Sequence, residues 1–297
     1  MKKIFLYTLL SFWFLQATIG FAQQKKEEIT VGPARGSLII VGGGTVGPEI
    51  WHRFIQLAGG PNANIVVIPT AGEDSSINTD KSFEKELLQN LGVKHVTILH
   101  TRNPKEANQE KFVAPLKKAT GIWFVGGRQW RLADAYLNTL AHRELQALLN
   151  RGGVIAGTSA GATIQGSFLL RGDTKGNSIL VGDHTQGLDF IHNVAIDQHI
   201  LRRNRQFDLI EVIKARPELL GIGIDETAAI VVQKDEFEVI GNSYVAIYDH
   251  NQFAGKVKSP AENNGTNGQF YFLNRGQKFD LKNRKVLAEK TAESAKL

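Results

Sequence analysis

Residues 151–162 of the chain read RGGVIAGTSAGA. An apolar run, Val154–Ala156, leads directly into Gly157-Thr-Ser159-Ala-Gly161, a G-x-S-x-G sequence between a predicted strand and a predicted helix. Glycines two positions either side of a serine permit the sharp turn that lifts its hydroxyl above the sheet edge. The N-terminus of the following helix then directs backbone N–H groups at a developing oxyanion. The stretch therefore predicts a nucleophilic serine, Ser159, on an α/β fold; a turn of small residues that serves only close packing is the alternative.

Short β-branched runs alternate with helical patterns on both sides of this stretch. The alternation is typical of an α/β domain with a mostly parallel sheet flanked by helices. The predicted strands are Ser37–Val41, Asn64–Ile68, Lys94–Leu99, Thr120–Val125, Gly153–Ala156, Asn193–Ile196, Gly221–Ile224 and Ala228–Val232, and the predicted helices include Val46–Leu57, Asp80–Leu91 and Trp130–Arg151. After residue 232, alternating strands separated by Gly/Asn turns predict an antiparallel C-terminal extension. We expect a single domain over residues 36–285 and a flexible tail over 286–297.

The first 22 residues have the composition of a secretory signal peptide. Lys2 and Lys3 precede an apolar run, Ile4–Ile19, that ends in small residues. A membrane anchor is the alternative, but the run is short for a bilayer and polar residues interrupt it. We expect cleavage after Ala22, export to the periplasm or the extracellular space, and no stable membrane insertion afterwards.

Charge and cysteine content exclude several classes of protein. The formal net charge is +6, and loss of Lys2 and Lys3 with the signal peptide leaves 33 basic and 29 acidic residues. No basic run with interleaved aromatic residues is present, so nucleic acid is not an expected partner. The chain has no cysteine, which excludes disulfides, cysteine-ligated zinc, iron–sulfur clusters and a thiol nucleophile.

Residues 42–47 read GGGTVG and match the G-x-G-x-x-G pattern directly after a predicted strand. A dinucleotide site also needs an acidic residue about 20 positions further on to bind the ribose. No Asp or Glu lies between Trp51 and Gly72. We therefore expect a tight glycine turn that lets substrate approach the backbone, rather than a nucleotide site.

A serine nucleophile needs a base, and the base needs an orienting partner. Among the eight histidines, His199 stands apart because it ends the polar sequence Asp197-Gln198-His199, directly after a predicted strand. The carboxyl ends of strands are where α/β sheets place their sites. For the acid, spacing alone does not choose among the aspartates between the serine and the histidine, which are Asp173, Asp183, Asp189 and Asp197.

Four sequence blocks, in this order, resemble the cyanophycinases, members of the serine peptidase family that also contains the bacterial aspartyl dipeptidases. The blocks are residues 126–129 (GGRQ), 157–162 (GTSAGA), 197–199 (DQH) and 221–227 (GIGIDET), within a resemblance over about residues 36–250. The resemblance implies an α/β sandwich related to class I glutamine amidotransferases, with serine in place of their cysteine. It implies no metal and no cofactor.

The same resemblance implies roles for individual residues. Ser159 would be the nucleophile and His199 the base. The acid, which family members place shortly after the nucleophile helix, is best matched by Asp173. Backbone N–H groups of Gly127 and Ala160 would form the oxyanion hole. The positions that line the cyanophycinase substrate pocket are matched by Gln129, Asp197 and Gln198.

Arginines follow the expected base, where cyanophycinases carry an arginine-rich helix start that contacts an acidic substrate. This chain has Arg202, Arg203 and Arg205 there, and we assign Arg203 and Arg205 to substrate binding through charge-assisted hydrogen bonds. A solvated helix face is the alternative. The chain departs from the family pattern at Asp208, near which a further arginine is expected. The implied substrate is cyanophycin, a poly-aspartate chain bearing arginine, or a β-aspartyl peptide, and analogy suggests a homodimer.

The sequence thus predicts an exported serine hydrolase that cleaves peptide or isopeptide bonds at acidic residues. Two alternatives remain. An esterase of the α/β-hydrolase fold would share the serine motif but would take its histidine near the C-terminus, where His250 is available. A noncatalytic exported binding protein on the same fold is the other.

Overall fold

The computed structural model describes residues 30–253 and 270–288, so the predicted signal peptide lies outside the described residues. Most of the tail expected over 286–297 lies outside them as well. Within the described part, none of the helices has the length and apolarity that crossing a bilayer requires. The chain is held in place before residue 36, because Val31 N–H donates to Asp235 Oδ1 at 2.7 Å and Gly32 N–H donates to Lys234 O at 2.9 Å.

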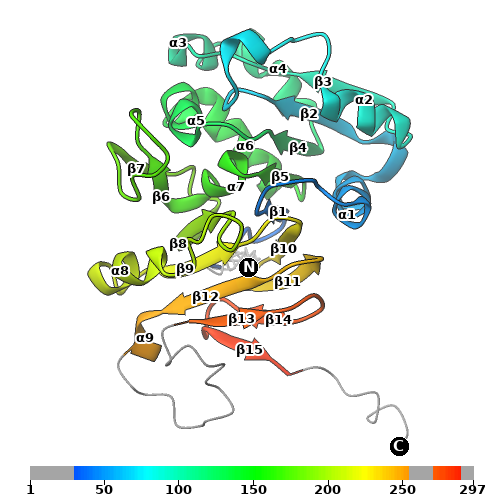
Figure 1. Ribbon diagram of the computed structural model, residues 1–297. Helices are drawn as coiled ribbons and strands as arrows, with labels where there is room; N and C mark the ends of the chain where they lie inside the picture. The colour runs from blue at the N-terminus through cyan, green and yellow to red at the C-terminus, as the bar shows by residue number, and fades with distance from the viewer. Residues whose placement is uncertain (1–29, 254–269, 289–297) are drawn as a thin grey trace, which may run out of the picture.

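A nine-stranded sheet runs through the molecule in the order β15-β14-β11-β10-β1-β5-β4-β2-β3 (Figure 1). Its strands are β1 (Ser37–Val41), β2 (Asn64–Ile68), β3 (His95–Ile98), β4 (Gly121–Phe124), β5 (Val154–Thr158), β10 (Ala228–Gln233), β11 (Glu236–Gly241), β14 (Lys278–Asp280) and β15 (Lys285–Leu287). The strands from β1 to β3 in this order are parallel, and β10 to β15 join them antiparallel. This confirms the mostly parallel α/β fold with its antiparallel extension, which continues to Leu287.

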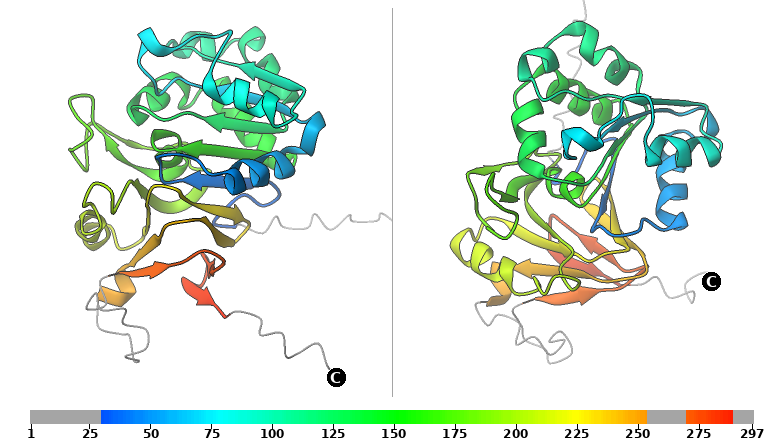
Figure 2. Two further views of the ribbon diagram at one scale, coloured as in Figure 1. Left: turned by 45° about the vertical axis from the view of Figure 1, so that its right-hand side comes forward. Right: turned by 45° about the horizontal axis from the view of Figure 1, so that its top comes forward.

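Helices cover both faces of the parallel part, and alternate residues of each strand face alternate layers (Figure 2). Ile39 and Val41 of β1 pack with α1 and α2, whereas Leu38 and Ile40 pack with the helices of the opposite face. The first layer consists of α1 (Pro48–Ala58) and α2 (Phe83–Asn90), with the short 3₁₀ turns η1 (Gly60–Asn62) and η2 (Asp74–Ser76). The second layer consists of α3 (Pro104–Ala107), α4 (Glu110–Lys118), α5 (Gln129–Tyr136) and α6 (Leu140–Asn150).

The helix expected over Trp130–Arg151 is two helices in the structure. Asn138 lies between them with a φ of 59°, which a right-handed helix does not permit. Thr139 then caps α6 by accepting the N–H of His142. A polar N-cap in the middle of an apolar pattern is the local reason for the break.

A second sheet of six strands packs beside the second helix layer, in the order β13-β12-β9-β8-β6-β7. Its strands are β6 (Gly166–Gly172), β7 (His184–Gln186), β8 (Ile191–Gln198), β9 (Leu220–Ile224), β12 (Val245–Asp249) and β13 (Tyr271–Leu273). Helix α8 (Asp208–Ala215) covers its outer face, α7 (Ala160–Thr163) follows β5, and α9 (His250–Phe253) follows β12. Sequence patterning does not separate the two sheets, because strands of both are buried and read as continuous apolar runs.

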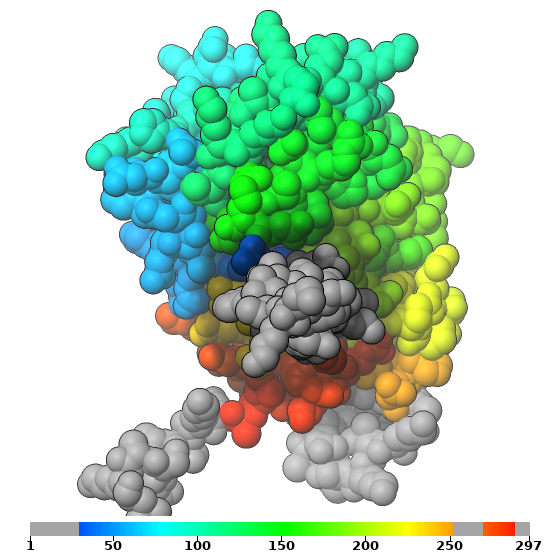
Figure 3. Space-filling view, turned by 180° about the vertical axis from the view of Figure 1, so that it is seen from behind, coloured from blue at the N-terminus to red at the C-terminus, as the bar shows by residue number. Residues whose placement is uncertain are grey.

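The two ends of the nine-stranded sheet lie at opposite ends of the molecule. Seen from behind, the residues coloured cyan to green fill the upper part, and the C-terminal residues, in orange and red, lie in the lower part (Figure 3). Strand β5 lies in the interior of the sheet, between β1 and β4. The loop after β5 is therefore flanked by the strand ends on both sides of it.

Candidate active site

Ser159 occupies a strained turn between β5 and α7. It has a φ of 55° and a ψ of −112°, a conformation that costs a non-glycine residue roughly 1–3 kcal/mol. The turn needs both of its glycines, because a Cβ at Gly157 would overlap the backbone of Gly161 and one at Gly161 would overlap Phe124. Ser159 N–H donates to Val41 O at 3.0 Å, which ties the turn to β1.

His199 lies against this serine at the end of β8. Its Nε2 is 2.9 Å from Ser159 Oγ, and its own φ is 55°. The ring lies over the glycine loop of residues 42–44, where a Cβ at Gly43 would overlap the imidazole. Residues 42–47 were expected to give substrate room at the backbone, and that expectation stays a prediction. The structure adds a second reason for glycine in this loop, because Gly43 leaves space for the histidine ring.

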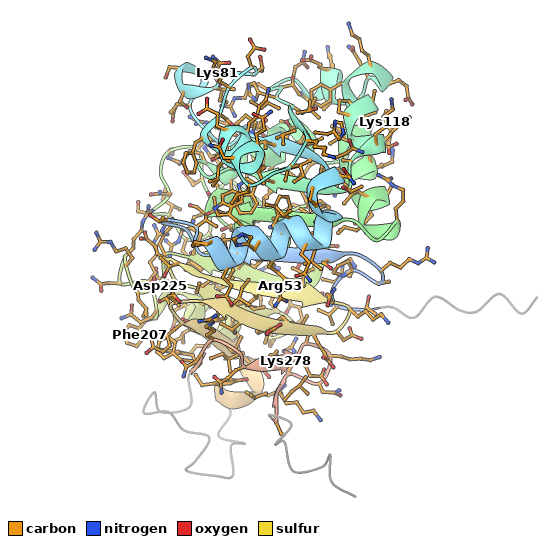
Figure 4. All side chains as sticks on the ribbon, turned by 90° about the vertical axis from the view of Figure 1, so that its right-hand side faces the viewer. Arg53, Lys81, Lys118, Phe207, Asp225 and Lys278 are labelled. Atoms are coloured by element: carbon orange, nitrogen blue, oxygen red, sulfur yellow. The ribbon has the colours of Figure 1, made fainter. Side chains whose placement is uncertain are left out.

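The carboxylate beside His199 belongs to Glu226. Its Oε1 is 2.7 Å from His199 Nδ1. Strands β8 and β9 are parallel neighbours with Gln198 opposite Ile224, so the residues that follow them lie side by side. Asp225 Oδ1 accepts the backbone N–H groups of Leu201 and Arg202, each at 3.0 Å, and so holds the segment after His199 against the end of β9. Figure 4 places Asp225 on the same side of the molecule as Phe207 and away from Lys118.

Asp173 does not make the contact that was expected of it. It opens the loop between β6 and β7, and its carboxylate accepts the N–H groups of Lys175 at 2.8 Å and Asp183 at 3.3 Å. These bonds cap the loop, and the carboxylate that meets His199 is that of Glu226. One feature of the sequence could have indicated Glu226, namely the acidic pair that directly follows the predicted strand Gly221–Ile224. Parallel strands end at a common edge of a sheet, so such a pair is expected to lie near the other residues that follow strands, His199 among them.

Burial lowers the pKa of His199 below its usual range, and the positive charges of Arg203 and Arg205 lower it further. The hydrogen bond to Glu226 acts in the opposite direction. The imidazole therefore stays neutral, and able to accept a proton from Ser159, to a lower pH than a free histidine.

The two residues expected to supply the oxyanion donors, Gly127 and Ala160, lie after β4 and directly after Ser159. Gly127 has a φ of 142° and packs against the peptide bond between Ala71 and Gly72. A Cβ at its neighbour Gly126 would lie 3.9 Å from Ser159 Oγ. Among the turn, loop and cap hydrogen bonds of the described residues, none has the backbone N–H of Gly127 or of Ala160 as its donor.

The residues expected to bind substrate divide into an exposed and a buried set. Arg203 is exposed. Gln129 is 1% exposed and donates to Leu170 O at 2.7 Å, and Gln198 is 3% exposed beside Arg205 Nη1. Burial lowers the pKa of Arg205 to about 10, with the charge of Arg171 adding to the effect.

Asp197, also expected to bind substrate, is fully buried against Arg171. Arg171 Nε donates to Asp197 Oδ1 at 2.8 Å and Nη2 to Oδ2 at 2.7 Å, a bidentate pair. Arg171 Nη2 also donates to Asp208 Oδ2 at 2.6 Å. The acidic residue at position 208, where a further arginine was expected, therefore extends this buried ion pair to a half-buried carboxylate.

A serine on a strained strand-to-helix turn, hydrogen-bonded to a histidine that is itself hydrogen-bonded to a carboxylate, defines a hydrolytic serine enzyme of the α/β class. A family model, "Peptidase family S51", matches residues 38–240. The chain belongs to this family and is a serine-type peptidase.

Individual relatives agree with the family assignment. The chain is 33% identical to the cyanophycinase of Geminocystis herdmanii over 266 residues, covering 86% of this chain and 97% of that protein. It is 31% identical to the cyanophycinase of a Nostoc species, covering 89% of this chain and 92% of that protein. The fold is similar to that of a peptidase from an acI-B1 Actinobacterium, with a TM-score of 0.57 and 24% identity over 84% of this chain and 98% of the other.

Proposed function

We propose that this protein is an exported peptidase that cleaves peptide or isopeptide bonds at acidic, β-aspartyl residues. The observation that carries the proposal is the continuous contact from Ser159 Oγ through His199 to Glu226 Oε1, at 2.9 and 2.7 Å. The cyanophycinase relatives support an aspartyl isopeptide as substrate. The basic and apolar sequence of residues 1–22 supports export.

In the proposed mechanism, Ser159 Oγ attacks the carbonyl carbon while His199 Nε2 takes the hydroxyl proton. Glu226 holds the proton of Nδ1, so that Nε2 faces the serine as an acceptor, and it stabilises the imidazolium that forms. The oxyanion accepts the N–H groups of Gly127 and Ala160. His199 then protonates the leaving amine, and water releases the acyl group from Ser159 by the same steps in reverse order.

Recognition of the acidic substrate is assigned to Arg203. Arg203 is exposed, and its positive charge lowers the pKa of His199. Its backbone N–H donates to His199 O at 2.9 Å, which fixes the two residues relative to one another. A substrate carboxylate bound there lies beside the base. The buried Gln198 and Arg205 hold the chain behind it, through Arg205 Nη1 and Gln198 O at 3.3 Å.

The test is mass spectrometry of products after incubation with cyanophycin and a panel of β-aspartyl dipeptides and their α-linked isomers. We expect the wild type to release products from at least one β-linked substrate and Ser159→Ala to release none. Cleavage by Ser159→Ala, or a wild type that cleaves only α-linked peptides, contradicts the proposal. Export is tested separately: after expression in a Gram-negative host, the mature chain is expected to begin at Gln23.

The two alternatives lack comparable support. An α/β-hydrolase esterase would use His250, yet the histidine in contact with Ser159 is His199. His250 begins α9 at the lower edge of the molecule, whereas α7, which follows Ser159, lies near its centre (Figure 1). A noncatalytic binding protein would have no use for a strained serine that contacts a buried histidine.

A further inference from the structure

Two arginines hold the loop that follows β2 by its backbone carbonyls. Arg102 Nη1 donates to Thr70 O, and its Nη2 donates to Gly72 O at 2.5 Å. Arg131 Nη1 donates to Gly72 O at 2.7 Å and to Ala71 O at 3.2 Å. Three successive carbonyl groups of one loop thus accept hydrogen bonds from two guanidinium groups.

Each guanidinium is also paired with a carboxylate of the same loop. Arg131 Nη2 donates to both oxygens of Glu73 at 2.8 Å, and Arg102 donates to Asp74 Oδ1 at 2.7–2.8 Å. The hydrogen bond from Arg102 holds the pKa of Asp74 below its usual value. The Arg131 side chain is only 15% exposed, so water competes little for its donors.

The two arginines come from different elements, so the loop is fixed from two sides. Arg102 follows β3, and Arg131 lies in the first turn of α5. The loop of residues 70–74 follows β2, which pairs with β3 on one side and with β4 on the other. The strand β4 leads into Gly127, which precedes α5 by two positions.

The held loop is in direct contact with Gly127. Arg128 N–H donates at 2.8 Å to Ala71 O, the carbonyl that Arg131 also binds. A Cβ at Gly127 would overlap the carbonyl of Ala71 and lie 2.8 Å from Gly72 N. The Arg128 N–H belongs to the Gly127–Arg128 peptide, which adjoins the peptide that presents the Gly127 N–H. The position of this loop therefore bears directly on the conformation of Gly127.

We propose that Arg131 and Arg102 are positioning residues that fix the loop of residues 70–74 so that the Gly127 N–H points at the transition-state oxyanion. The inference rests on the proposed function, because it takes the Gly127 N–H as an oxyanion donor. Both arginines act through the loop, and neither is assigned a contact with substrate. Their effect is on the transition state and not on ground-state binding, since the hole is complementary to the oxyanion.

The test compares Arg131→Met and Arg102→Met with Arg143→Met, an exposed arginine on α6. Three quantities are measured: kcat and KM on a peptide that the wild type cleaves, the Kd of a peptide boronate whose tetrahedral adduct places an oxygen in the hole, and the rate at which a fluorophosphonate labels Ser159. Arg131→Lys, which keeps the charge but loses the planar fork, is included in case the methionine variant fails to fold.

For Arg131→Met and Arg102→Met we expect kcat and the labelling rate to fall by about 10- to 100-fold, because a misplaced oxyanion donor costs less than the roughly 10²- to 10³-fold loss that follows its removal. The affinity for the boronate should fall by the same factor, while KM changes by less than about threefold. The kcat and labelling rate of Arg131→Lys should lie between those of the wild type and Arg131→Met, and those of Arg143→Met should match the wild type.

The inference is overturned if Arg131→Met, or Arg131→Lys where only that variant folds, keeps kcat and boronate affinity within about twofold of Arg143→Met, whatever its melting temperature. A rise in KM at constant kcat overturns it as well. Failure of the proposed function is a separate result, namely a wild type that cleaves no β-aspartyl peptide. The labelling rate of Ser159 then still decides whether the arginines act on the hole.

Discussion

Glu226 Oε1 lies 2.7 Å from His199 Nδ1, and Ser159 Oγ lies 2.9 Å from the other nitrogen of the same ring. The imidazole is thus held between an acid and a nucleophile that come from loops after two different sheets. The loop after β5 carries the serine, and the neighbouring ends of β8 and β9 carry the histidine and the acid.

Replacing each carboxylate in turn should show whether Glu226 or Asp173 orients His199. Glu226→Gln keeps the shape of the side chain but favours the tautomer in which Nε2 cannot accept the serine proton, so kcat should fall by roughly 10²- to 10⁴-fold. Asp173→Asn should leave kcat within about threefold, because Asp173 only caps its own loop. Steady-state hydrolysis of one β-aspartyl peptide measures both, and a larger loss for Asp173→Asn would reverse the assignment.

Gly43 should tolerate no side chain, because the His199 ring occupies the space. Gly43→Ala is expected to displace the ring from Ser159, to abolish hydrolysis and to lower the free energy of unfolding by about 1–3 kcal/mol. Gly47→Ala, in the same loop but with no atom within 4 Å of the added Cβ, is the control. Urea unfolding and peptide hydrolysis check both, and an active Gly43→Ala enzyme would show that His199 is not held as described.

The pH dependence of kcat/KM should depend on Arg203. Burial and the Arg203 charge both lower the pKa of His199, so the acid limb of the wild-type profile should lie below the pKa of a free histidine. Arg203→Gln removes a positive charge, which raises the pKa and moves the acid limb to higher pH. Arg202→Gln is the matched control and should leave the limb in place. A limb that moves to lower pH in Arg203→Gln would contradict the assignment of His199 as the base.

The buried pair of Arg171 and Asp197 should be important for stability. Both side chains are at most 2% exposed, so Arg171→Met removes the bidentate partner of a buried carboxylate and leaves it only the more distant Arg205 Nη1, at 4.0 Å. We expect a loss of about 3–5 kcal/mol in the free energy of unfolding. Asp208→Asn should cost much less, since the Asp208 side chain is 38% exposed. Chemical denaturation measures both variants, and similar losses would mean that the network does not depend on burial.

Much of the fold follows from local patterns. The runs Ser37–Val41 and Asn64–Ile68 are strands with the predicted bounds, because continuous β-branched residues suit a sheet covered on both faces. The second sheet does not follow in this way. Helix α7 has only four residues before the chain turns into β6, and nothing local to Gly166–Gly172 indicates which sheet it joins.

The candidate site likewise contains residues that local sequence predicts and residues that it does not. Ser159 and His199 are predicted from short motifs at strand ends, and they are in contact in the structure. Glu226 lies 27 residues from His199, and their contact depends on the register between β8 and β9. The burial of Asp197 depends equally on Arg171, which reaches it from β6. An acidic pair directly after the strand Gly221–Ile224 marks a candidate carboxylate in the sequence. Which side chain that carboxylate contacts is set by tertiary structure.

The most direct test of the account is to label the protein with a fluorophosphonate and to map the modified residue by tandem mass spectrometry. We expect one adduct, on Ser159, that is lost in His199→Ala and retained in His250→Ala. An unlabelled wild type, an adduct on another residue, or labelling that depends on His250 and not on His199 would contradict it.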